Sequence, residues 1–114
     1  MYKMNYIELT INGVDYKLTL NMANMIALEK KLGTNPLNKL IELQQNKMPD
    51  FDFLTTILYY SFKKYQTKIS VNEVYDIVDL YLAEGNDIGA LIQLIMSVFE
   101  VSGYFRQPKA EEEN

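Results

Sequence analysis

Residues 7–18 read IELTINGVDYKL, and this stretch decides how the fold begins. Apolar and polar residues alternate on both sides of Asn12-Gly13, as they do in strands with one buried face. Asn-Gly supplies the two positive φ angles of a type I′ turn, which joins antiparallel strands through two residues. We therefore predict a β-hairpin over residues 6–20. Its register pairs Ile11 with Val14, Leu9 with Tyr16 and Ile7 with Leu18.

Beyond the hairpin the apolar spacing changes from two residues to about 3.6, the period of an α-helix. Favourable N-cap residues precede the periodic segments: Asn21, Asn35, Asp50, Ser70 and Asp87. Ser70 and Glu73 also have the spacing of a capping box. The predicted helices span residues 22–32, 36–45, 51–65, 71–84 and 88–101. The fold class is therefore α+β, mainly α, with an N-terminal β-hairpin followed by a bundle of about five helices.

One domain over residues 1–105 suits a chain of 114 residues. Residues 106–114 hold a proline and three consecutive glutamates without apolar periodicity, so we predict a mobile acidic tail. The residues predicted to face inward are Met22, Met25, Ile26, Leu28, Leu32, Leu37, Leu40, Ile41, Phe53, Leu54, Ile57, Leu58, Phe62, Tyr65, Val74, Ile77, Val78, Tyr81 and Leu82. The helix over 88–101 is apolar around most of its circumference, so either it is central to the bundle or a partner covers it.

The composition excludes several classes of function. The chain has no cysteine and no histidine, so disulfides, thiolate zinc sites and histidine-based catalytic triads are excluded. We predict that the protein is not an enzyme and binds no cofactor. The net charge is −4 and Arg106 is the only arginine, which argues against nucleic-acid binding. No apolar segment is long enough to span a membrane and the N-terminus does not resemble a signal peptide, so a cytoplasmic protein is expected.

The acidic residues of the helix over 71–84 are the one group that could carry chemistry. Glu73, Asp76 and Asp79 lie on the side of this helix away from its apolar stripe, with Glu84 and Asp87 beyond them. A solvated face is the favoured interpretation. The alternative is an enzyme that holds a divalent metal through these carboxylates.

Aromatic residues are abundant, with nine tyrosines and five phenylalanines, and they serve both small cores and interface hot spots. Tyr59 and Tyr60 flank predicted core positions, and Tyr104-Phe105 follows the last helix. The candidate partner-binding residues are Tyr59, Tyr60, Met96, Phe99, Tyr104 and Phe105.

The hairpin offers a second candidate interface, because two strands leave both outer edges unpaired. Another strand could add there, or the helices and loops of the same chain could cover the edges. Both interpretations stay open at this point. We expect self-association through the hairpin edge or through the helix over 88–101.

Four segments, taken in order, resemble the tail assembly chaperones of long-tailed, siphovirus-type bacteriophages and prophages. They are residues 7–20, 27–37, 70–85 and 98–105. The resemblance implies a protein that binds the tape measure protein, keeps it soluble and helps to recruit tail tube subunits. It also implies a place in the cytoplasm of the bacterial host, absence from the mature virion, and in some members a longer form made by frameshifting.

A permanent structural component of a phage or prophage, such as a head–tail joining or tail completion protein, is the alternative function. Such a protein would also be small, acidic and without catalytic residues. The two hypotheses differ in whether the protein stays in the particle.

Overall fold

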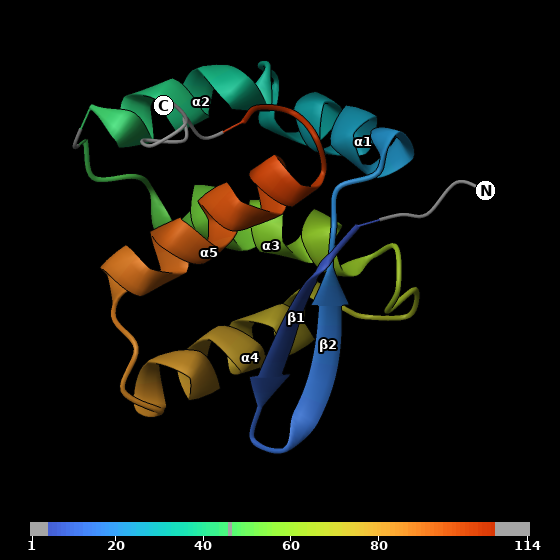
Figure 1. The fold of residues 1–114 in the computed structure, drawn as a ribbon, viewed down its shortest axis with the longest axis vertical. Coiled ribbons are helices and arrows are strands. Elements are labelled where there is room, and N and C mark those ends of the chain that lie inside the picture. Colours follow the sequence, from blue (N-terminus) through green and yellow to red (C-terminus); the bar gives the residue numbers. More distant parts are fainter. Residues whose placement is uncertain (1–4, 46, 107–114) are drawn as a thin grey trace, which may run out of the picture.

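The computed structural model describes residues 5–45 and 47–106, which form a two-stranded antiparallel sheet followed by five helices (Figure 1). The strands are β1 (Ile7–Ile11) and β2 (Val14–Leu18). The helices are α1 (Met22–Leu32), α2 (Pro36–Gln44), α3 (Phe51–Phe62), α4 (Val71–Ala83) and α5 (Ile88–Val101). The predicted fold class is confirmed. Apart from Arg106, the predicted acidic tail lies outside the described residues.

The hairpin has the predicted register, with Ile11 opposite Val14, Leu9 opposite Tyr16 and Ile7 opposite Leu18. Asn12 and Gly13 both have positive φ, 51° and 78°, as a type I′ turn requires. The Asn12 N–H donates to the Glu84 carboxylate at 2.9 Å, which ties the turn to the end of α4.

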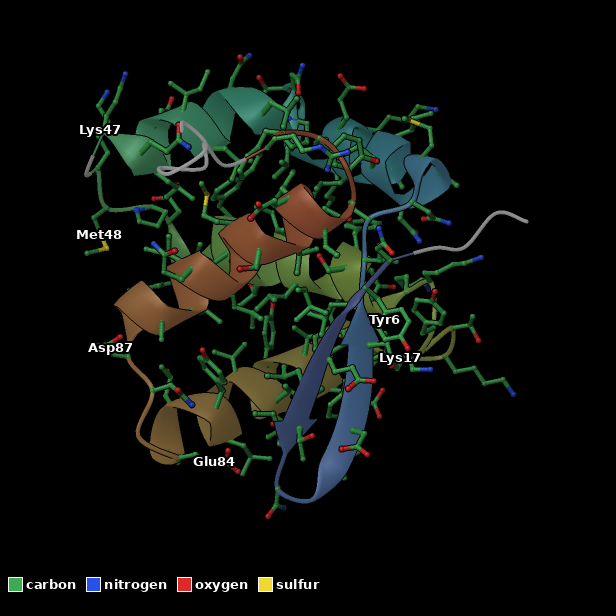
Figure 2. All side chains as sticks on the ribbon, viewed as in Figure 1. Tyr6, Lys17, Lys47, Met48, Glu84 and Asp87 are labelled. Carbon is green, nitrogen blue, oxygen red and sulfur yellow. The ribbon has the colours of Figure 1, made fainter. Side chains whose placement is uncertain are left out.

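Lys17 packs its ammonium group against aromatic rings on the outer face of the hairpin. Its Nζ lies 4.9 Å from the ring centroid of Tyr6 and 5.6 Å from that of Tyr65, and the two rings meet edge to face. Figure 2 shows Tyr6 and Lys17 beside each other at the end of the hairpin that lies opposite the Asn12-Gly13 turn. This cation–π contact fixes the residues that follow α3 against the sheet.

The helices begin where the cap residues predict. Side-chain oxygens of Asn21, Asn35 and Asp87 accept hydrogen bonds from the first-turn amides of α1, α2 and α5. Ser70 and Glu73 form both hydrogen bonds of the capping box at α4. Asp50 occupies the N-cap position of α3 but makes no side-chain cap bond there.

The end of α3 differs from the prediction, because the helix stops at Phe62 and not at residue 65. The Gln66 side chain hydrogen-bonds the backbone N–H and C=O of Lys17 in β2, and the Tyr65 ring packs on Tyr6. These contacts with the hairpin replace a further turn of α3. Tyr65 is consequently exposed, contrary to its predicted place in the core.

The elements form three tiers in Figure 1, with α1 and α2 at one end, α3 and α5 in the middle, and α4 with the hairpin at the other end. Helix α3 contacts α1, α4, α5 and β2. One core joins the hairpin to the helices. Its fully buried large side chains include Leu18, Leu28, Leu54, Ile57, Phe62, Val74, Ile95 and Phe99.

Besides Tyr65, four apolar residues predicted to lie on buried faces are exposed. They are Val14 (49%), Met22 (61%), Ile26 (44%) and Ile41 (52%). Helices α1 and α2 lie at one end of the bundle and bury only a narrow stripe each, so side chains beside the stripe stay open to solvent. Val14 lies next to the hairpin turn, at the end of the core.

Helix α5 is central to the bundle, which was one of the two interpretations of its apolar circumference. Leu91, Ile95, Met96, Val98 and Phe99 are all buried against the rest of this chain. The last turn continues into Ser102, whose Oγ accepts from the Leu20 N–H at 2.8 Å and donates to the Val98 carbonyl. Packing within the same chain therefore explains why α5 is apolar around most of its circumference, and no partner is needed to cover it.

Candidate partner-binding surface

Two of the six candidate partner-binding residues, Met96 and Phe99, lie in the core and not on the surface as a partner-binding role would require. Met96 is 7% exposed and Phe99 is 0% exposed. Both lie on the side of α5 that packs into the bundle, so a partner cannot contact them while this fold is intact.

The other four are half-buried, and several have contacts within the chain. Tyr59 and Tyr60 meet edge to face with centroids 5.0 Å apart, and the Lys63 Nζ lies 5.3 Å from the Tyr59 centroid. The Tyr104 hydroxyl donates to the Leu20 carbonyl at 2.8 Å, and burial raises the pKa of this phenol. Phe105 packs against the core. A role of these four in binding stays a prediction.

The outer edge of β2 is largely closed. The Lys17 N–H donates to Gln66 Oε1 at 2.9 Å, and the Lys17 carbonyl accepts from Gln66 Nε2 at 2.9 Å. The Thr19 N–H donates to the Ser61 carbonyl at 3.0 Å. Of the two interpretations of the hairpin edges, coverage by the same chain is therefore the correct one for the outer edge of β2. A second strand cannot pair with β2 along these residues.

Helix α4 forms a ridge on the outside of the bundle. Val74, Ile77 and Tyr81 face the core, while the exposed side opposite them includes Asp76 and Asp79. The helix contains three acidic residues and no basic one. The ridge is therefore negatively charged and has apolar residues on both of its flanks.

A groove of about 510 Å³ runs along one flank of α4, between this helix, the connection from α3 to α4 and Tyr16 of β2. We call it the β2–α4 groove. Its apolar lining consists of Tyr16, Ile69, Ile77 and Leu80. Its polar lining consists of Gln66, Thr67, Lys68, Glu73 and Asp76.

A groove of about 390 Å³ follows the other flank, between α4 and the first turns of α3. We call it the α3–α4 groove. It is lined by Phe51, Asp52, Thr55, Tyr75, Val78 and Asp79. Both grooves thus combine apolar side chains with carboxylates.

No family model matches this chain, and neither the curated proteins nor the solved structures contain a match to it. The arrangement of the residues themselves is therefore the basis for any functional proposal.

The acidic residues do not assemble into a metal site in the described part of the chain. Residues 5–45 and 47–106 hold no group of three or more carboxylates placed to share an ion. Glu73 is engaged in the capping box, where its Oε1 accepts from the Ser70 N–H at 2.8 Å. Glu73, Asp76 and Asp79 are therefore not brought together as a group of ligands in the described residues. Asp87 lies at the start of α5 (Figure 2). Burial raises the pKa of Tyr81, and the nearby Asp87 carboxylate raises it further.

None of the helices in the described residues has the length and apolar character that crossing a membrane requires.

Three exposed apolar residues that line the grooves were missed at the level of sequence. Phe51, Tyr75 and Leu80 belong to segments with a clear apolar repeat, and each lies beside the buried stripe of its helix. The positions of Tyr75 and Leu80 on the helical wheel of α4 could have shown that both residues lie beside the buried stripe. They could not show that the neighbouring elements leave grooves next to these two residues.

Proposed function

We propose that this protein is a tail assembly chaperone of a long-tailed bacteriophage or prophage. It binds the tape measure protein in the cytoplasm of the bacterial host, keeps it soluble and helps to recruit tail tube subunits. One observation carries the proposal, namely the exposed apolar side chains on both flanks of α4: Phe51 (61%), Tyr75 (44%) and Leu80 (39%). Exposed apolar surface of this kind is suited to covering apolar segments of another chain.

Three of the four segments that carry the family resemblance lie in the hairpin, in α4 and at the end of α5, whereas residues 27–37 lie in α1 and α2 at the other end of the bundle. Residues 7–20 make the hairpin, residues 70–85 make α4 with its cap, and residues 98–105 end α5 and lock against Leu20 through Tyr104. The resemblance therefore extends over parts of the chain that pack together. This supports a function at the α4 ridge.

Co-expression with a fragment of the tape measure protein tests the proposal. We expect the fragment to be soluble and to co-purify with this protein, and to be insoluble alone. The double variant Phe51→Asp/Leu80→Asp should lose co-purification. The matched control Ile26→Asp/Ile41→Asp changes equally exposed residues of α1 and α2 and should retain it. A fragment that is equally insoluble with and without the wild-type protein would contradict the chaperone function.

Mass spectrometry of purified particles separates this function from a structural one. A chaperone that acts only during assembly should be absent from the mature virion. Stoichiometric amounts in the particle would favour the head–tail joining or tail completion protein instead.

A further inference from the structure

The β2–α4 groove follows the axis of α4 for about two helical turns. Glu73, Asp76, Ile77 and Leu80 line its α4 wall, and these positions recur at the three- and four-residue spacing of one helix flank. The distance from residue 73 to residue 80 along a helix axis is about 10 Å. Tyr16 of β2 and Ile69 of the connection before α4 complete the apolar lining. The groove is therefore elongated along α4, and each of the elements that line it contributes apolar side chains.

The charges beside the groove select for a positively charged occupant. Glu73 and Asp76 are both exposed on the α4 wall, and Asp79 lies one turn further along the ridge. Lys68 is the single basic residue among the lining residues. The excess of carboxylates disfavours an anionic partner such as nucleic acid and favours lysine or arginine beside an apolar stripe.

The backbone around the groove selects for a helix and against a strand. An added strand needs free N–H and C=O groups at a sheet edge, and Gln66 already occupies both groups of Lys17 on the edge of β2 that borders the groove. An α-helix satisfies its own backbone groups, so it needs only an apolar surface to pack on. A helix is thus the secondary structure that fits.

We propose that the β2–α4 groove binds an amphipathic helix of a partner protein, with the apolar stripe of the helix on Ile69, Ile77 and Leu80. Basic side chains that flank this stripe face Glu73 and Asp76. The inference rests on the proposed function, in that the helix belongs to the protein which this chain keeps soluble.

Fluorescence anisotropy with designed peptides tests this docking mode in the full-length protein. The probe is a labelled peptide of about 18 residues, long enough to form a helix, with leucine on one face and lysine on the other. One control peptide has the same composition in strict Leu-Lys alternation, the pattern of a strand. A second control has glutamate in place of lysine. We expect the helical lysine peptide to bind most tightly and to bind more weakly as salt concentration rises.

Two single variants locate the binding. Leu80→Asp removes an apolar side chain from the groove, and Asp76→Lys reverses an exposed charge on α4. Each should weaken binding of the lysine peptide at least about tenfold. The matched controls are Ile26→Asp and Glu29→Lys on α1, which should leave binding unchanged. Circular dichroism confirms that each variant is folded.

The proposal is overturned if the alternating peptide binds as tightly as the helical one, or if both groove variants bind like wild type. Retained co-purification of the tape measure fragment by Leu80→Asp and Asp76→Lys would also overturn it, while leaving the proposed function intact. Failure of the wild-type protein to hold the fragment at all would instead remove the proposed function.

Discussion

The Gln66 side chain connects the edge of β2 to the end of α3. Its side-chain oxygen accepts from the Lys17 N–H, and its amide donates to the carbonyls of Lys17 and Phe62 at 2.9 and 2.7 Å. One side chain thereby closes the edge of β2 and connects it to the end of α3. The residue satisfies the outward-facing N–H and C=O of Lys17, which a third strand would satisfy in a larger sheet.

Gln66→Ala should lower the free energy of unfolding by about 1–2 kcal/mol, because three hydrogen bonds are lost and water replaces them only in part. Urea denaturation measures the change. Gln93→Ala is the control, since Gln93 is an exposed glutamine of α5, and its effect should stay within about 0.5 kcal/mol. Equal effects of the two substitutions would show that the edge is not held by Gln66.

Two tyrosine phenols, Tyr104 and Tyr81, make the stability of the protein depend on pH in the alkaline range. Burial raises the pKa of Tyr104 above its ordinary value, and burial followed by the Asp87 carboxylate does the same for Tyr81. The folded state therefore holds these protons more tightly than the unfolded state does. Their contribution to stability is complete below about pH 10, the ordinary tyrosine pKa, and is lost as the pH rises through the folded-state pKa.

Tyr104→Phe should consequently make the loss of stability above about pH 10 shallower, as followed by urea denaturation at a series of pH values. At neutral pH the variant should be about 1 kcal/mol less stable, since the hydrogen bond to the Leu20 carbonyl is gone. Adding Tyr81→Phe should flatten the alkaline decline further. An unchanged slope in both variants would be inconsistent with this explanation.

Among the elements, the starts of α3 and α4 offer a direct comparison of two N-caps. Ser70 and Glu73 form a complete capping box, whereas the Asp50 side chain makes no cap hydrogen bond. Ser70→Ala should cost about 1 kcal/mol of unfolding free energy, a typical value for a lost cap. Asp50→Ala should cost less than half of that, and thermal or urea unfolding measures both. A larger loss for Asp50→Ala than for Ser70→Ala would contradict this ranking.

Local chemistry explains which elements could be predicted. The hairpin register follows from Asn12-Gly13 and the alternation around it, and the helix starts follow from cap residues next to their helices. The end of α3 could not be predicted in this way. It depends on Gln66 and Tyr65 meeting a hairpin that lies far away in sequence, and such contacts override a continuing apolar repeat.

At the scale of the whole molecule, burial could be predicted more completely for an element that other elements surround than for one at the end of the bundle. The apolar repeats of α3 identified core residues such as Leu54 and Phe62, because other elements cover this helix on several sides. Ile26 and Ile41 belong to similar repeats but lie on helices at one end of the bundle. The grooves beside α4 depend on how three elements are spaced, so no local pattern contains them.

The shared core predicts that the hairpin and the helices unfold as one unit. Leu18 of β2 is fully buried, and α3 packs on that strand. Leu18→Ala should therefore cost about 2–5 kcal/mol, a large part of the stability of a domain of this size, and should shift every probe together. Far-ultraviolet circular dichroism reports the helices, and hydrogen exchange of the β1 and β2 amides reports the hairpin.

The control is Val14→Ala, at an exposed site on the same strand, which should lower the free energy of unfolding by less than about 1 kcal/mol. The opposite result would be a helical signal that keeps its wild-type midpoint while the hairpin amides of Leu18→Ala exchange freely. The hairpin would then be a separate unfolding unit, and the part of the β2–α4 groove that Tyr16 lines would be only as stable as that hairpin.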